Sequence, residues 1–160
     1  MNKYMQMADE MSKQNLLTNA GGPFGAVIVK DGKVVGVGNN HVLKNNDPTA
    51  HAEVMAIRNA CQNLNTFDLT GCELYTSCFC CPMCLAAAIW ANIKTVYYGN
   101  TQEDAADIGF RDDFIYKYIQ SMKDDTFSPD SDVLKLIPLD REETIQAFED
   151  FKNKTDKTMY

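Results

Sequence analysis

Hydrophobic and polar residues follow two different periods along this chain. Near the N-terminus, apolar side chains recur at roughly helical spacing between polar residues, namely Tyr4, Met7, Met11 and Leu16. This spacing predicts a helix over residues 4–18. Two apolar runs, residues 26–29 and 33–37, then flank Asp31-Gly32, which is a strong signal for a two-residue β-hairpin.

Helical and extended patterns alternate through the rest of the chain. Asp47-Pro48-Thr49 is typical of a helix start, and a helical period continues from there to Cys61. Later helices are expected at residues 82–91, 102–107, 114–122 and 142–151, and later strands at residues 73–76, 94–98 and 133–139. Strands that alternate with helices after an opening hairpin predict an α/β domain whose sheet is at least partly parallel.

Composition narrows the class of protein. A chain of 160 residues is most simply one domain with a core of ordinary size. The N-terminal residues are polar every few positions, which does not fit a signal or transit peptide. No apolar run approaches the length that spans a bilayer. We therefore expect a cytoplasmic protein.

The charge of the chain is acidic. Net charge is −7, from 22 acidic and 15 basic residues, and lysine and arginine form no cluster. A nucleic-acid partner is disfavoured because the phosphate backbone is bound by basic surfaces. No membrane partner is expected either, so a small-molecule substrate is the better hypothesis.

The densest chemistry lies between Thr76 and Cys84, where four of the six cysteines fall within nine residues, T-S-C-F-C-C-P-M-C. In a chain expected in the cytoplasm, such cysteines favour metal binding or catalysis over disulfides. Cys81 and Cys84 are three residues apart and Pro82 suits a first helical position, so both thiols can share one face at a helix N-terminus. By itself, C-P-M-C is compatible with a redox, structural or metal-binding role.

His51 offers a third ligand for a metal. A His/Cys/Cys set leaves one position of tetrahedral Zn²⁺ open for water, which is typical of catalytic zinc sites. Glu53 can serve such a site as a base that takes a proton from the water and returns it to the substrate. Because Glu53 is two residues after His51, both can converge only if His51 lies in the first turn, before the helix is regular.

Other cysteines and the second histidine have simpler interpretations. Cys78 and Cys81 form a competing Cys-x-x-Cys pair. Cys61 and Cys72 are expected to be small core residues. His41 follows Asn39-Asn40 in an expected loop, so its side chain is expected to be solvated.

H-A-E at residues 51–53 with C-P-M-C at residues 81–84 resembles the zinc signature of the cytidine-deaminase-like superfamily, H-x-E followed by P-C-x-x-C. Segments 21–32, 46–54, 104–110 and 114–117 are similar to bacterial guanine deaminases of that superfamily. The resemblance implies a three-layer α/β/α sandwich around a five-stranded mixed sheet, formed as one domain by residues 1–160. The same resemblance implies one Zn²⁺ per chain and an activity, the hydrolytic deamination of guanine to xanthine and ammonia.

The resemblance also implies roles for individual residues. His51, Cys81 and Cys84 match the zinc ligands, Glu53 matches the proton shuttle and Asp112 matches a carboxylate near the substrate amino group. From the residues alone, Asp112 or Asp113 could instead cap a helix at Phe114. The positions that match substrate contacts are Phe24, Asn40, Ala52, Trp90 and Tyr160. One departure from the family pattern is Phe79-Cys80, where the family has Glu-Pro before the first cysteine ligand.

The C-terminal residues, F-K-N-K-T-D-K-T-M-Y, are typical of a frayed tail. The resemblance implies instead a domain-swapped homodimer, in which residues 151–160 cover the partner subunit's active site and Tyr160 closes the pocket.

Two other functions stay open. One is deamination of another nucleobase, a nucleoside or an RNA adenosine. The other belongs to a different class, a non-catalytic zinc or thiol redox module.

Overall fold

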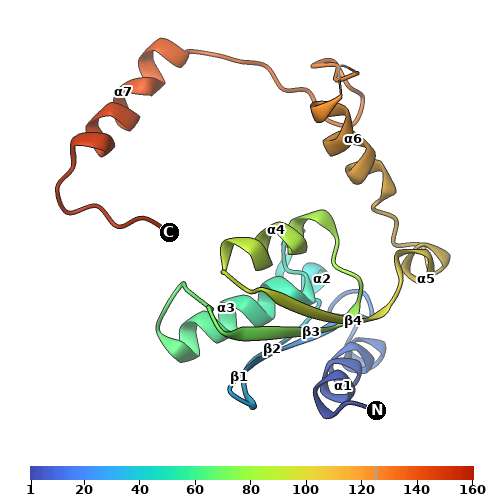
Figure 1. The fold of residues 1–160 in the computed structure, drawn as a ribbon. Helices are drawn as coiled ribbons and strands as arrows, with labels where there is room; N and C mark the ends of the chain where they lie inside the picture. The colour runs from blue at the N-terminus through green and yellow to red at the C-terminus, as the bar shows by residue number, and fades with distance from the viewer. Residues whose placement is uncertain (125) are drawn as a thin grey trace. The chain divides into compact units, whose positions relative to one another are not determined.

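The computed structural model describes residues 1–124 and 126–160, which form two compact units, residues 1–112 and 113–160. The first unit contains the sheet, whose strands are β1 (Gly25–Lys30), β2 (Lys33–Asn39), β3 (Cys72–Cys78) and β4 (Thr95–Asn100). Their order is β2-β1-β3-β4 (Figure 1). β1 is antiparallel to β2 and to β3, whereas β3 and β4 are parallel. The sheet is therefore mixed, as expected.

Helices cover both faces of this sheet, because β1 carries apolar side chains on both. On one face Val27 and Val29 pack with Ala8 of α1 (Lys3–Thr18). On the other face Ala26 and Ile28 belong to a larger cluster with alanines of α3 (Ala52–Leu64) and α4 (Pro82–Trp90). The first unit is thus a three-layer α/β/α arrangement.

Glycines of β2 allow α3 to lie unusually close to the sheet. A Cβ at Gly38 would stand 2.4 Å from the carbonyl oxygen of Ala52, and one at Gly36 would stand 2.5 Å from that of Ala56. Larger residues would push the helix away from the strand. This close packing fixes the first turn of α3, which carries His51 and Glu53.

The remaining helices are short or lie outside the first unit. α2 (Val42–Asn45) and α5 (Gln102–Asp107) belong to the first unit, and α6 (Asp113–Lys123) and α7 (Arg141–Asn153) form the second. No described residue of the second unit is buried. Within the described residues, no helix has the length and apolar character needed to cross a membrane.

Most of the predicted elements are confirmed, but the five-stranded sheet is wrong: the described residues form a sheet of four strands. The expected strand at residues 133–139 has no ladder, because the described part of its own unit contains helices and no strand to pair with. Its polar contacts are local, such as the Leu136 amide donating to the Pro129 carbonyl. The α1 pattern also placed Leu16 with the apolar residues, whereas Leu16 is exposed and Asn15 is buried.

Candidate metal centre

Two helix N-termini carry the residues of the candidate site. His51 precedes α3 as its N-cap, in extended conformation with φ −68° and ψ 156°. Cys81 precedes α4 in the same way, with φ −64° and ψ 166°, and Pro82 takes the first helical position. The partial positive charge of a helix N-terminus stabilises thiolates and other anions. Both helices cover the same face of the sheet, so the two motifs meet there.

The three expected ligands lie at distances suited to one tetrahedral ion. His51 Nδ1 is 3.5 Å from Cys81 Sγ and 3.6 Å from Cys84 Sγ. With usual Zn–S and Zn–N bond lengths, tetrahedral geometry requires an N···S separation of about 3.6 Å. In the described part of the chain, these three residues form one group whose ligand atoms all lie within 4.8 Å of one another. The donor set and its spacing therefore fit Zn²⁺.

Glu53 lies beside these ligands, because His51 precedes the regular part of the helix. Glu53 is 6% exposed, and its Oε2 is 3.4 Å from Cys84 Sγ. Burial raises the pKa of Glu53, since a low-dielectric environment disfavours the charged form. A carboxyl with a raised pKa beside a metal position is suited to accept a proton and to return it.

The thiols are electrostatically unequal in the absence of metal. The pKa of Cys81 is lowered to about 4, chiefly by a hydrogen bond from the Cys84 thiol and to a smaller extent by one from His51. The same pairing raises the pKa of Cys84, because its proton is held between the two sulfurs. The hydrogen bond with Cys81 raises the pKa of His51. Binding of zinc requires both thiols to lose their protons.

The other two cysteines of the run are buried but are placed differently. The Cys78 thiol donates to the Thr101 carbonyl at 3.5 Å, and burial raises its pKa to about 11. Burial also raises the pKa of Cys80, whose thiol hydrogen-bonds the Glu53 carboxyl. The ligand group contains neither thiol, so the geometry favours Cys81 with Cys84 over the competing pair Cys78 with Cys81.

Some of the expected substrate contacts lie in well-defined surroundings. Asn40 is 5% exposed, and its Oδ1 accepts from the Val42 amide at 3.1 Å. The backbone N–H of Asn40 donates to the Phe24 carbonyl at 3.1 Å. The Phe24 ring packs edge-to-face on Phe110 with centroids 5.0 Å apart, and Ala52 is fully buried in the first turn of α3.

The remaining expected contacts are less enclosed. Asp112 accepts from Gln102 Nε2 at 3.3 Å, while α6 begins at Asp113. Trp90, the last residue of α4, is 68% exposed, and Tyr160 of the second unit is 84% exposed. Within the single chain, Asn40 and Ala52 are therefore buried, whereas Trp90 and Tyr160 are exposed.

Sequence reasoning missed two polar residues that organise this region. Asn15 donates from Nδ2 to the carbonyls of Gly22, at 2.7 Å, and Asn40, at 2.8 Å, and accepts from Asn39 at 2.6 Å. Thr76 contacts Glu53 from β3. A polar residue at a core-facing helical position was the available signal for Asn15. The sequence carried no comparable signal for Thr76.

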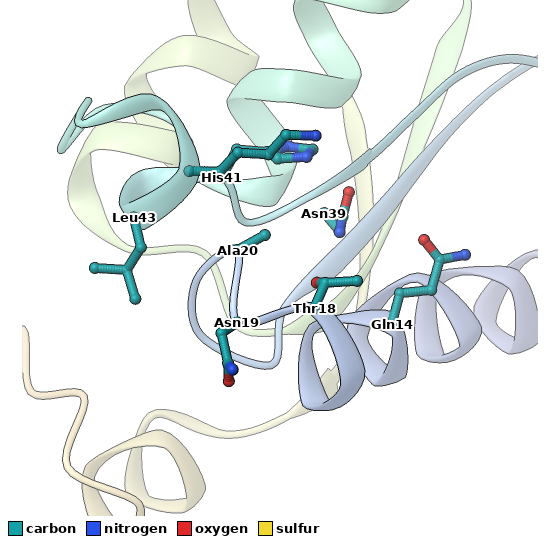
Figure 2. Close-up of a pocket in the computed structure, with 8 residues that line it drawn as sticks. Gln14, Thr18, Asn19, Ala20, Asn39, His41 and Leu43 are labelled. Carbon is teal, nitrogen blue, oxygen red and sulfur yellow. The ribbon is translucent and has the colours of Figure 1, made fainter.

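His41 is not the solvated residue expected from its loop position. It is half-buried, and its Nδ1 is a buried atom without a hydrogen-bond partner. The ring lines a pocket of about 480 Å³ together with Gln14, Thr18 and Asn39 (Figure 2). His41 is therefore less exposed than a loop residue was expected to be, since residues of α1 and of the loop at Ala20 line the same pocket.

Comparison with known proteins gives a consistent family. Residues 1–100 match the cytidine and deoxycytidylate deaminase zinc-binding region. The chain is 45% identical over 151 residues to a guanine deaminase of Bacillus subtilis strain 168, covering 94% of this chain and 95% of that protein. The X-ray structure of the Bacillus subtilis guanine deaminase superposes with a TM-score of 0.91 at 42% identity, covering 100% of this chain and 99% of that one.

A second kind of deaminase matches a shorter part of the chain. A tRNA-specific adenosine deaminase of Aquifex aeolicus is 46% identical over 76 residues, 48% of this chain and 50% of that protein. The similarity to the guanine deaminase extends instead through almost the whole length of both proteins. The chain therefore belongs to the bacterial guanine deaminases of the cytidine and deoxycytidylate deaminase superfamily.

Proposed function

We propose that this protein is a zinc-dependent enzyme that hydrolyses guanine to xanthine and ammonia. The observation that carries the proposal is the convergence of Glu53 with His51, Cys81 and Cys84 at two helix N-termini. Near-full-length similarity to a guanine deaminase supports guanine as the substrate. One water molecule is consumed for each amino group released as ammonia.

His51, Cys81 and Cys84 are proposed to hold one Zn²⁺ per chain. Three protein ligands leave the fourth tetrahedral position open. Zinc in such a site lowers the pKa of a water molecule and so supplies a nucleophile near neutral pH. The two thiolates offset much of the ion's charge, which makes a neighbouring protein base more important for removing the proton of the water.

Glu53 is proposed to move the protons of the reaction. It takes one proton from the attacking water and delivers it to N3 of guanine as the water oxygen bonds to C2. It then passes the remaining proton of that oxygen to the amino group, and the C2–N bond breaks to give ammonia and the C2 carbonyl of xanthine. Its burial suits this role, since the raised pKa lets the carboxyl hold a proton transiently. Asp112 is proposed to lie near the amino group that leaves.

The purine is proposed to bind against Asn40, Phe24 and Ala52. The amide of Asn40 can pair with polar edges of guanine, and the Phe24 ring supplies an apolar surface for a planar base. Trp90 is proposed to line the same pocket. Its exposure in the single chain leaves its ring accessible to substrate or to a partner subunit.

The functional form is proposed to be a homodimer with exchanged C-terminal segments, in which residues 151–160 cover the partner subunit's active site. The second unit contains apolar residues but no described buried side chain, and several of its large apolar residues are exposed, including Ile137, Leu139 and Phe148. Burial of such residues against another copy is favourable. Exchange of an identical element is a low-cost route to a dimer.

We also propose a domain organisation and a cytoplasmic location for this chain. We propose that residues 1–160 act as one deaminase domain whose last ten residues serve as the lid. All six cysteines are free thiols, which fits the proposed reducing environment of the cytoplasm.

Ammonia release across a panel of compounds tests the function directly. The panel contains guanine, adenine, cytosine, cytidine, guanosine and an RNA with an unpaired adenosine. We expect guanine to react at least about 10²-fold faster than the others, since mismatched polar edges leave buried groups unpaired. Faster turnover of a pyrimidine or of the RNA would replace guanine with that substrate. No turnover in a zinc-loaded protein would favour a binding or redox module.

A further inference from the structure

The hydroxyl of Thr76 connects the carboxyl of Glu53 to the loop that follows β3. Thr76 is 1% exposed, and its Oγ1 lies 3.2 Å from Glu53 Oε1. The same oxygen lies 3.1 Å from the carbonyl oxygen of Cys78. A buried hydroxyl therefore has two acceptors but only one proton to donate.

This arrangement can hold one oxygen of Glu53 in place. The Thr76 hydroxyl can donate to Oε1, and its second contact, with the Cys78 carbonyl, limits where the hydroxyl can move. A carboxyl that exchanges protons with a substrate must keep a fixed orientation toward it, and a buried hydroxyl on Oε1 restricts rotation of the carboxyl group.

The other oxygen of the carboxyl lies beside a ligand sulfur. Cys84 Sγ is 3.4 Å from Oε2, whereas the Thr76 hydroxyl is 3.2 Å from Oε1. The two carboxyl oxygens therefore have different neighbours: Oε1 is held by a hydroxyl, and Oε2 lies on the side of the candidate metal ligands.

We propose that Thr76 is a positioning residue that holds Glu53 Oε1, so that Oε2 acts on the substrate. The proposal rests on the guanine deaminase activity proposed above. Cys80 also hydrogen-bonds Glu53, but a thiol is a weaker donor than a hydroxyl. Thr76 is therefore expected to carry most of the effect.

Two substitutions of Thr76 separate its hydroxyl from its shape. Thr76→Val keeps the volume and removes the hydroxyl, and kcat is expected to fall about 10- to 100-fold, which is the range for a lost hydrogen bond to a charged group. The KM for guanine and the zinc content should stay within about twofold of wild type. Thr76→Ser retains the hydroxyl and should keep kcat within about threefold. Cys80→Ala is expected to lower kcat less than Thr76→Val does.

Cys72→Ala is the matched control for a small change within the same strand. Cys72 is buried at the opposite end of β3, so the substitution is expected to lower stability without lowering kcat. If kcat falls in the control as it does in Thr76→Val, strand packing and not the hydroxyl is responsible. A fall in Cys80→Ala as large as that in Thr76→Val would transfer the role to Cys80.

Carbon-13 NMR of protein labelled at the glutamate Cδ detects the contact between Thr76 and Glu53 independently of any measurement of activity. The Glu53 carboxyl resonance, assigned by its loss in Glu53→Gln, should shift in Thr76→Val and remain near its wild-type position in Thr76→Ser. An unchanged resonance and unchanged kcat in Thr76→Val would overturn the proposal. If wild-type protein does not deaminate guanine, the proposed function fails, while the resonance still reports whether Thr76 holds Glu53.

Discussion

His51 Nδ1 lies 3.5 Å from Cys81 Sγ, although 30 residues separate them in sequence. Each is the N-cap of its helix, His51 of α3 and Cys81 of α4. Two helix N-termini therefore meet at one site, where their partial positive charges favour thiolates and a bound anionic oxygen.

Replacing single cysteines with serine tests which sulfur atoms bind zinc. Cys81→Ser should lose most bound zinc, because a serine hydroxyl is a much poorer zinc ligand than a thiolate. Cys80→Ser is the matched control, an adjacent buried cysteine outside the ligand group, and should keep one zinc per chain. Metal analysis of purified proteins measures both. Zinc lost from Cys80→Ser but kept by Cys81→Ser would show that the wrong sulfur was chosen.

Glu53→Gln should bind guanine and keep zinc but react slowly. An amide of the same shape cannot take or return protons, and general acid–base groups contribute about 10²–10⁴-fold. Single-turnover kinetics with measured guanine and zinc binding separates the chemical step from binding. Near-normal turnover in this variant would contradict the proposed proton path.

Metal removal should expose an unusually reactive thiolate at Cys81. Because the pKa of Cys81 is lowered to about 4 in the metal-free protein, its thiolate is populated above that pH and is lost only as pH falls through that value. Alkylation by iodoacetamide should then vary little between pH 6 and 8, whereas an ordinary thiol reacts about tenfold faster per pH unit in this range.

Mass spectrometry of the modified peptide measures the alkylation rate at each pH. Added zinc should slow the reaction by occupying the sulfur. A rate that rises tenfold per pH unit at Cys81 would mean that its thiol is not stabilised as a thiolate.

Asn15→Ala should destabilise the fold. The substitution leaves the carbonyls of Gly22 and Asn40 without their side-chain donor and removes the acceptor of Asn39. A buried polar group that loses its partner costs about 1–3 kcal/mol, so the loss of three such contacts is expected to lower stability by about 3 kcal/mol or more in urea unfolding. The KM for guanine should also rise, because Asn40 is held less firmly.

Gln14→Ala on the exposed side of the same helix is the control for the Asn15 variant. It should change stability by less than about 0.5 kcal/mol, as is usual for surface positions. Equal stabilities of the two variants would show that the Asn15 contacts contribute little.

Deletion of residues 157–160 tests the exchanged lid. Folding and zinc content should be retained, while kcat/KM for guanine should fall by about tenfold or more, because the pocket stays open to water. Tyr160→Phe keeps the ring that would cover the purine and should retain most activity. Sedimentation should show a dimer for the full chain. Full activity of the truncated protein would show that the segment is only a tail.

Local sequence signals predicted most of the elements and the candidate ligand set. Asp31-Gly32 predicted the hairpin because a two-residue turn needs positive φ, and both residues adopt it at 50° and 74°. Pro82 predicted the start of α4 because its ring presets the helical φ. His51, Cys81 and Cys84 could be chosen from their chemistry and spacing, because zinc accepts few ligand types.

Tertiary structure decided the features that depend on a distant partner. The extended pattern of residues 133–139 did not make a strand, since a strand requires the hydrogen-bonding groups of a neighbour and the described part of its unit offers none. The surroundings of His41 also depend on distant segments, because residues of α1 and of the loop at Ala20 line the same pocket. The contact of Thr76 with Glu53 arose because β3 and the first turn of α3 meet across 23 residues of sequence, a proximity that local patterns do not encode.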